Sequence, residues 1–441
     1  IREEVLGQVR PTLSDRKRLM QTSATIIARI EDLARERGLS LKAMLVGSAA
    51  RGTWLAGDHD LDIFLGVPPG DDLGAALELA RLVAPDHEEK YAEHAYVNAR
   101  MDGFEVDLVP CYLVEDAAHL KSAVDRTPFH TKYVASRIIG LEDDVLLLKQ
   151  FMKGVDVYGS ELKVGGFSGY LAELLVLCYG SFAAVLQAAS TWRPGLCLDL
   201  EKHGIGRHDE PLIVVDPVDP GRNVAAALSL DKMLQFAAAA RSFLAEPKHD
   251  FFFAPALAPL SDEEIIAQIN ARGTMPILLE FAAPDVVEDV LYPQLRKAEG
   301  AIKALLERSG FSLLRSDVST YRDRVVMLFE MQVWQLSGTC QRIGPPVWQA
   351  DHLARFLAAH PRPLSGPYIA NGKVVVEEAR KYTSARDLLA GESANLSMGK
   401  HLSASIRCGH NIYVDLELLS IRDEGFRIFL AHYFQAKFRV G

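Results

Sequence analysis

The chain has 441 residues, of which 49% are hydrophobic and 24% are charged, and its formal net charge is −10. This composition is typical of a globular protein with more than one domain. No apolar run approaches the roughly 20 residues that span a membrane, and the N-terminal residues lack the basic and apolar regions of a signal peptide. We therefore expect a cytoplasmic protein without membrane contact.

The acidic excess is unevenly distributed along the chain. Residues 61–120 contain 3 Lys or Arg against 13 Asp or Glu, whereas residues 301–441 contain 18 against 13. The net charge argues against a generic nucleic-acid-binding protein. The acidic stretch can attract cations, however, and the distal basic surplus can attract a polyanion.

The first predicted elements form a phosphate-binding turn. Apolar periodicity predicts a helix over residues 13–37, and residues 41–46 form a short apolar strand. Gly47 and Ser48 then open a helix, with Ser48 as its N-cap. Free N–H groups and the helix dipole at this end would face an anion, so we expect a nucleoside triphosphate there.

Two aspartates follow in a second predicted strand. Acidic or aromatic residues alternate with aliphatic ones from Asp60 to Leu65, so a period of two places Asp60 and Asp62 on one face. Gly-Ser before a helix and Asp-x-Asp on a strand are each common, as capping residues and as a solvated face. Their combination, about a dozen residues apart within apolar flanks, is typical of polymerase-β-type nucleotidyltransferases.

A third carboxylate is expected in a later strand. Two-metal phosphoryl transfer needs ligands for two cations, because one holds the triphosphate and the other activates the attacking hydroxyl. Residues 103–112 alternate again, with Glu105 and Asp107 on one face, and we expect Pro110 to end this strand. Asp107 is the better candidate for the third ligand.

Helices dominate the middle of the chain. Thr127 is expected to cap a helix that has His130 in its first turn. Residues 142–192 are predicted to form two helices, with Ser168 capping the second, and an alanine-rich helix is expected from about 224 to 245. We therefore expect a helical domain beside the nucleotide site.

The distal half has a mixed pattern. The Pro-rich residues 247–259 predict a domain boundary. Beyond it the expected strands are 274–281 and 325–336, and the expected helices are 291–309 and 351–359, before an appendage that runs to Gly441. The fold class predicted for the whole chain is α+β multidomain.

Several segments carry a resemblance to one enzyme family, and Ser122–His130 is the most specific of them. The others are Gly47–Phe64, Tyr91–Tyr96, Val106–Tyr112, Gly166–Tyr170, Asp216–Ala226 and Leu291–Leu295. With these segments the chain resembles the archaeal-type, class I, CCA-adding enzymes, which are tRNA nucleotidyltransferases of the polymerase-β-type superfamily. The resemblance implies four domains: a polymerase-β-like nucleotidyltransferase head (1–140), a helical neck that binds the nucleotide (141–255), an α+β body (256–360) and a mainly helical, tRNA-binding tail (361–441).

The resemblance also implies an activity and a site. The activity is template-independent addition of C, C and A to the tRNA 3′ end from CTP and ATP, with release of pyrophosphate. Asp60, Asp62 and Asp107 would be catalytic and would bind two Mg²⁺ ions. The nucleotide-binding residues would be Ser48, Arg51, His130, Lys149, Tyr158 and Arg222. The tRNA would bind through its acceptor stem and T arm, and a homodimer is one of the oligomeric states left open.

Some of these residues also have plain structural explanations. His130 could act only as a helix cap, Lys149 could extend along an amphipathic helix, and Tyr158 could belong to a core. Arg222 has only hydrogen-bond donors, which suit the ring-nitrogen acceptors of C and A better than the ring N–H of U and G. The alternative for Arg222 is a structural ion pair with Asp216 or Asp219.

Two other functions are weighed against CCA addition. Another polymerase-β-type transferase, such as a poly(A) polymerase or an oligoadenylate synthase, should lack the Ser122–His130 pattern. A catalytically inactive RNA-binding protein would have little reason to retain three acids at such a site. A class II CCA-adding enzyme is disfavoured, because no Arg-Arg-Asp segment follows the acidic pair.

Overall fold

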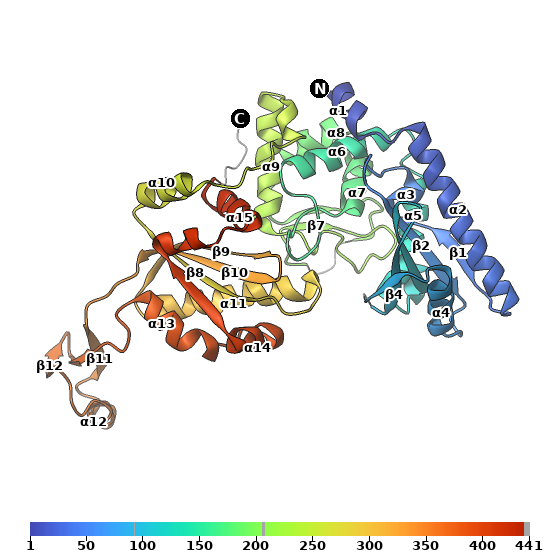
Figure 1. Cartoon of the computed structure of the whole chain (residues 1–441). Coiled ribbons are helices and arrows are strands. Elements are labelled where there is room, and N and C mark those ends of the chain that lie inside the picture. The colour runs from blue at the N-terminus through green and yellow to red at the C-terminus, as the bar shows by residue number, and fades with distance from the viewer. Residues whose placement is uncertain (92, 205–207, 436–441) are drawn as a thin grey trace. The chain divides into compact units, whose positions relative to one another are not determined.

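The computed structural model describes residues 1–91, 93–204 and 208–435 (Figure 1). Contacts within the chain divide it into two compact units, one of residues 1–255 and the other beginning at Ala256. Ala92, in the Tyr91–Tyr96 segment, and residues 436–441 of the predicted tail lie outside the described residues.

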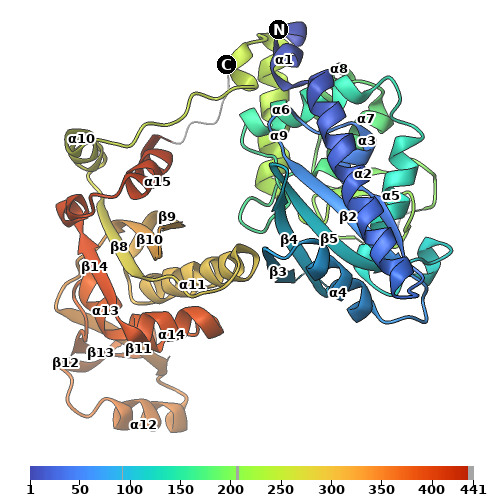
Figure 2. The same cartoon turned by 45° about the vertical axis from the view of Figure 1, so that its right-hand side comes forward.

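A five-stranded sheet in the order β1-β2-β5-β4-β3 organises the first part of unit one. The strands are Lys42–Leu45 (β1), Asp60–Val67 (β2), His87–Tyr91 (β3), Ala95–Met101 (β4) and Phe104–Tyr112 (β5). Leu61, Ile63 and Val106 pack with α2 (Leu13–Glu36) and α4 (Leu73–Val83), which cover one face of the sheet (Figure 2). The residues that alternate with them point to the opposite face, so the predicted grouping of the acids on one face is confirmed.

The predicted end of β5 is wrong. The strand passes through Pro110 and continues to Tyr112, paired in parallel with β2. β4 pairs with β5 only as far as Leu108. Beyond that residue β5 has a neighbour on one side alone, so the absent N–H of Pro110 interrupts no ladder on the other side.

The helical part of unit one packs around an aromatic-rich core. Its elements are α1 (Arg2–Val9), α3 (Gly47–Arg51), η1 (Ala117–His119), η2 (Ala123–Arg126), α5 (Thr127–Ala135), α6 (Glu142–Gly154), α7 (Gly169–Tyr179), α8 (Phe182–Ala189), β6 (Leu196–Leu198), β7 (Leu212–Val214), α9 (Leu230–Ala245) and η3 (His249–Phe251). Phe151 of α6 contacts the rings of Phe182 and Phe236. Helix α1 packs in this core although it begins the chain.

The predicted helix starts have different outcomes. Ser168 caps α7 as predicted, because its Oγ accepts the N–H of Leu171 at 3.1 Å. Ser48 is the second residue of α3 and does not cap it, since that helix begins at Gly47. Thr127 is likewise the first residue of α5 rather than its cap, because η2 runs into α5 without a break.

The predicted helix count over residues 142–192 is also wrong. Gly180, with a φ of 87°, ends α7, so α8 is a third helix. Helix α9 begins at Leu230 rather than near 224, because Ser229 caps it. Among the described residues, no single helix is long and apolar enough to cross a membrane, and α7 with α8 meet that test only as a pair bent by 93°.

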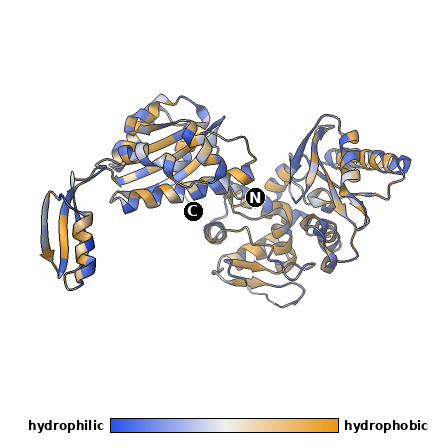
Figure 3. Ribbon diagram, turned by 90° about the horizontal axis from the view of Figure 1, so that it is seen from below, coloured by the Kyte–Doolittle hydropathy of each residue, from blue (hydrophilic) through white to orange (hydrophobic). Residues whose placement is uncertain are grey.

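Unit two is built on an antiparallel sheet in the order β14-β8-β10-β9. Its elements are α10 (Asp262–Arg272), β8 (Met275–Ala282), α11 (Glu288–Arg308), β9 (Ser312–Tyr321), β10 (Arg324–Val333), α13 (Ala385–Glu392), η4 (Ser393–Asn395), α14 (Lys400–Cys408), β14 (His410–Val414), η5 (Asp415–Ser420) and α15 (Glu424–Gln435). Helices α11, α13 and α14 cover one face of the sheet, and α10 and α15 cover the other (Figure 1). Its helices show both hydrophobic and hydrophilic residues along their length (Figure 3).

A smaller sheet interrupts unit two. It has the order β11-β13-β12, with bounds Thr339–Pro346 (β11), Ser365–Ala370 (β12) and Lys373–Ala379 (β13), and α12 (Ala350–Ala359) packs against it. Residues 380–435 then return to the main sheet and its two cores. The structure therefore divides unit two differently from the predicted boundary at residue 360, because the predicted tail supplies an edge strand of the predicted body.

Candidate active site

The three predicted catalytic acids lie on the same face of two adjacent strands. The parallel register places Asp62 opposite Asp107, and Asp60 opposite Glu105. Asp60 and Glu105 are exposed, whereas Asp62 and Asp107 are half-buried. The pairing of β2 with β5 thus brings together acids that are far apart in the sequence.

No cation forms an ion pair with these acids in the described chain. Burial, followed by the charges of Asp107 and Asp60, raises the pKa of Asp62 to about 6. Burial also raises the pKa of Asp60, with neighbouring carboxylates adding to it, and it raises the pKa of Asp107. Lys153, Arg51 and Lys90 oppose these shifts without forming an ion pair, so the surroundings compensate the negative charge of the acid face only in part.

The glycine of the predicted phosphate-binding turn lies beside this face. Gly47 has a φ of 69°, which favours glycine, and a Cβ at this position would overlap the carboxylate of Asp62. The backbone also connects the two segments, because the N–H of Val46 donates to the carbonyl oxygen of Asp62 at 2.9 Å. The structure thus places the Gly47-Ser48 turn next to the acid pair.

The acid face suits a hard divalent cation by its chemistry. Its donors are all carboxylate oxygens, the ligands that Mg²⁺ prefers. Burial is the main cause of their raised pKa values, and neighbouring carboxylates add to it. As the side chains stand, no group of three His, Cys, Asp or Glu in the described residues is arranged to hold a metal ion. The carboxylate of Asp107 accepts a hydrogen bond from Asn98 at 2.6 Å.

A second cluster surrounds Glu173 of α7, which is fully buried. The Nε of Arg51 lies 2.9 Å from its carboxylate, and the Nζ of Lys149 lies 3.9 Å from it. The hydroxyl of Thr53 also donates to Glu173, while the carbonyl oxygen of Thr53 accepts from Lys149 at 2.8 Å. Two predicted nucleotide-binding cations are thereby held on one buried carboxylate.

Tyr158 lies close to the Glu173 cluster. A Cβ on Gly169 would lie 3.0 Å from the hydroxyl of Tyr158 and 3.4 Å from the Nζ of Lys149. Burial raises the pKa of Tyr158 and lowers the pKa of Lys149, although the charge of Glu173 opposes the second effect. Tyr158 therefore keeps its proton at neutral pH and can donate it in a hydrogen bond.

A third cluster surrounds Asp216, which is also fully buried. Its Oδ2 lies 2.8 Å from the Nε2 of His130 and 2.9 Å from the NH1 of Arg222. The ring of Tyr170 stacks on that of His130, with centroids 4.1 Å apart. Burial alone would raise the pKa of Asp216, but the hydrogen bond and charge of His130, with the N–H of Val218 and Arg222, lower it.

The predicted residues thus fall into three groups. The sequence analysis did not identify Glu173, the acid at the centre of the second group. Asp60, Asp62 and Asp107 share a face, Arg51 and Lys149 share Glu173, and the Arg222 pair with Asp216 matches its predicted structural alternative. Glu173 had a signal that could have revealed it. It is the one charged residue of the otherwise apolar α7, and a charge in such a helix needs a buried partner.

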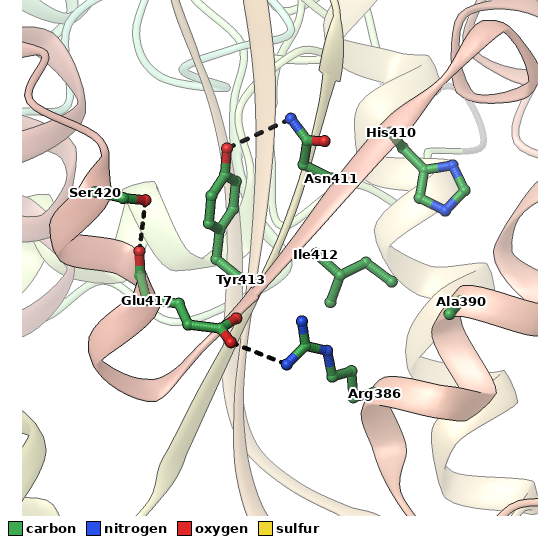
Figure 4. Close-up of a pocket in the computed structure, with 8 residues that line it drawn as sticks. All are labelled: Arg386, Ala390, His410, Asn411, Ile412, Tyr413, Glu417 and Ser420. Atoms are coloured by element: carbon green, nitrogen blue, oxygen red, sulfur yellow. Dashed lines mark hydrogen bonds and ion pairs between the residues drawn. The ribbon is translucent and has the colours of Figure 1, made fainter.

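A separate hollow lies in unit two (Figure 4). It has a volume of about 630 Å³, and β14 forms one wall of it. Arg386 and Glu417 form an ion pair of 3.0 Å across it. It contains none of the predicted catalytic or nucleotide-binding residues.

Comparison with known proteins agrees with this geometry. Three family models match: "Nucleotidyltransferase domain" over residues 27–130, "tRNA nucleotidyltransferase, second domain" over 143–253, and "CCA-adding enzyme, C-terminal domain" over 272–415. The CCA-adding enzyme of Methanosarcina acetivorans is 44% identical over 97% of this chain and 96% of its own. The chain belongs to the CCA-adding enzyme family.

A more distant CCA-adding enzyme is also similar over nearly the whole chain. The CCA-adding enzyme of Haloarcula marismortui is 39% identical over 99% of both chains. Among solved structures, "Structure of E. coli MS115-1 CdnC + ATP" matches 57% of this chain and 93% of its own, with a TM-score of 0.44 and 19% identity. That structural likeness is too distant to inform the function.

Proposed function

We propose that this chain adds C, C and A to the 3′ end of tRNA from CTP and ATP, without a nucleic-acid template and with release of pyrophosphate. Its place in the CCA-adding family supports the reaction. The observation that carries the chemistry is the only partly compensated acid face, where Asp62 and Asp107 are paired across β2 and β5. A nucleotidyl transfer needs negative charge at this point to bind cations.

In this proposal Asp60, Asp62 and Asp107 would hold two Mg²⁺ ions. When bound, the ions would lower the pKa of the tRNA 3′ hydroxyl and neutralise charge on the triphosphate. The strand register places the backbones of Asp62 and Asp107 side by side, and their side chains would have to turn toward a bound ion. Asn98 restrains one oxygen of Asp107 and thereby orients the carboxylate.

The remaining side chains would hold the nucleotide. Ser48, on the turn beside Asp62, and the basic groups of Arg51 and Lys149 would face the triphosphate. Glu173 would keep both cations in place, because the Nε of Arg51 lies within 3.0 Å of both carboxylate oxygens and the Nζ of Lys149 lies 3.9 Å from one of them. His130, Tyr158 and Arg222 would contact the phosphate, the sugar and the base.

For tRNA binding we propose that residues beyond 255, which include the predicted body and tail, contact the acceptor stem and T arm. The module of residues 339–379 is one candidate, because it exposes the large side chains of Ile343 and Trp348, at 66% and 76%. An exposed indole can stack on a nucleotide base. We place the reaction in the cytoplasm, and leave a homodimer as a proposal.

Another polymerase-β-type transferase and an inactive RNA-binding protein were the alternatives. The match to a CCA-adding C-terminal domain model supports CCA addition over the first. The retention of three acids supports catalysis over the second.

The activity is tested by incubating the protein with tRNA that lacks its terminal CCA, with Mg²⁺ and with each nucleoside triphosphate alone or together. Sequencing of the products should show C, C and A added in that order, and no extension with UTP or GTP. Poly(A) tails would support the first alternative, and unextended tRNA the second.

The role of residues 339–379 has its own test. Their ends meet, since the N–H of Arg380 donates to the carbonyl oxygen of Gly338 at 2.8 Å, so a short glycine linker can replace the module. The deletion should weaken binding of an acceptor-stem and T-arm minihelix and reduce its salt dependence. Equal binding by the intact and deleted chains, with unit two still folded, would exclude the module from the tRNA contacts.

A further inference from the structure

Asp216 joins two predicted nucleotide-binding side chains through a single oxygen atom. It begins the turn of residues 216–223 that follows β7, and its side chain is inaccessible to solvent. Its Oδ2 lies 2.8 Å from the Nε2 of His130 and 2.9 Å from the NH1 of Arg222. His130 comes from α5, so the carboxylate links two segments that are 86 residues apart.

The other carboxylate oxygen is also occupied. Its partners are the N–H of Val218 at 3.1 Å and the hydroxyl of Tyr170 at 3.4 Å. The backbone closes the turn as well, because the N–H of Asp216 donates to the carbonyl oxygen of Arg222 at 3.0 Å. The position of the carboxylate is therefore fixed by several independent contacts.

One nitrogen of the Arg222 guanidinium is held by Asp216, and the rest of the group is partly exposed to solvent. Its side chain is 38% exposed, although the carboxylate that holds its NH1 is fully buried. A guanidinium carries five N–H donors in a rigid plane. Anchoring one nitrogen therefore determines which of the remaining donors face outward, and hydrogen-bond selection depends on such fixed directions.

We propose that Asp216 is a positioning residue for base selection: its buried carboxylate orients Arg222 toward the base of the incoming nucleotide and holds His130 in the same site. The proposal rests on the proposed function and goes beyond it. Because its side chain is fully buried, Asp216 would act through Arg222 and His130 rather than by touching the nucleotide. A carboxylate is needed because it is a pure acceptor, whereas an amide would present its N–H₂ to donors.

The test compares two aspartates of the same turn. Asp219 is the matched control, because its carboxylate accepts from Arg126 at 2.6 Å, and only its backbone carbonyl, which the substitution leaves in place, accepts from Arg222. Single-turnover incorporation of each of the four nucleoside triphosphates into tRNA ending in –C, –CC or no CCA residue gives the ratio of correct to incorrect incorporation. For Asp216→Asn this ratio should fall by about tenfold or more, and for Asp219→Asn it should stay within about twofold.

A second comparison distinguishes positioning from support of the fold. In an Arg222→Ala background, Asp216→Asn should cause no further loss of discrimination, because the side chain that it orients is absent. Asp216→Glu, which keeps the charge but lengthens the side chain, should also lower the ratio, and serves if the Asn variant fails to fold. A ratio unchanged in every folded Asp216 variant would overturn the inference. Failure of the wild type to add C and A would instead overturn the proposed function.

Discussion

Asp62 and Glu173 are both acids inside unit one, but one lies among other acids and the other among cations. Burial, followed by the charges of Asp107 and Asp60, raises the pKa of Asp62 to about 6, although the charge of Arg51 opposes this shift. Glu173 has Arg51 at 2.9 Å and Lys149 at 3.9 Å. The protein thus completes the surroundings of Glu173 and leaves those of Asp62 to be completed by something that is not part of the chain.

This difference distinguishes a carboxylate that can bind a cation from one that positions neighbouring side chains. A carboxylate whose pKa is raised by burial and by neighbouring acids is stabilised when a proton or a cation binds, which supports the proposed metal site. A carboxylate already held by cations gains nothing from a further cation and instead fixes the groups that hold it. Asp216, whose pKa is lowered by His130 and Arg222, belongs to the second kind.

The largest expected effect is on catalysis at the acid face. Asp62→Asn or Asp107→Asn should lower the rate of C and A addition by about a thousandfold or more, since each removes a charge that two metal ions need. Affinity for tRNA should change little. The matched control is Glu105→Gln, an exposed acid on the same face opposite Asp60, which should lower the rate by less than about tenfold. Near-normal addition by the Asn variants would contradict the assignment.

The next effect is on stability, at the compensated acid. Glu173→Ala should lower the free energy of unfolding by about 3–5 kcal/mol, because it leaves Arg51 and Lys149 buried without their carboxylate. Denaturant unfolding of unit one measures this change. Glu173→Gln keeps the volume and part of the hydrogen bonding, so it should cost less. If the Ala variant were as stable as the wild type, Glu173 would not be holding the two cations.

The smallest effect has the opposite sign. Without metal at about pH 8, Asp62→Asn should raise the free energy of unfolding by about 1–3 kcal/mol, because the folded state no longer holds that charge among acids. The pKa of Asp62 is about 6 in the folded chain and 3.8 ordinarily. The protonated carboxyl therefore stabilises the folded wild type at low pH, and this stability is lost as pH rises from about 3.8 through about 6. The two proteins should therefore converge near the lower end of this pH range. A difference independent of pH would point to packing instead of charge.

Local patterns predicted much of this fold because they depend on neighbouring residues. The alternation along β2 and β5 showed which residues share a face, and Ser168 marked the start of α7. They could not show which strand lies beside which. That β14 pairs with β8, more than a hundred residues earlier, follows from packing over the whole unit, and so the predicted tail was separated from a sheet to which it belongs.

The same limit applies to the site. The sequence predicts which acids share a strand face, but which of them lie side by side depends on the register of β2 against β5. Arg51 and Lys149 look like free cations in the sequence, and their shared partner lies 122 and 24 residues further on, in another helix. The Ser48 cap was mispredicted because a turn that ends in a five-residue helix offers too little sequence to fix its first residue.

The most direct test of this account is the thermal unfolding midpoint of unit one, measured for the wild type and Asp62→Asn at about pH 8, first with a chelator and then with millimolar Mg²⁺. In the chelator the variant should unfold at the higher temperature. Mg²⁺ should then raise the midpoint of the wild type and raise that of the variant much less, because the variant lacks one of the three carboxylates that would hold the ions. An equal rise in both proteins, or none in the wild type, would contradict the claim that the acid face is completed by a cation.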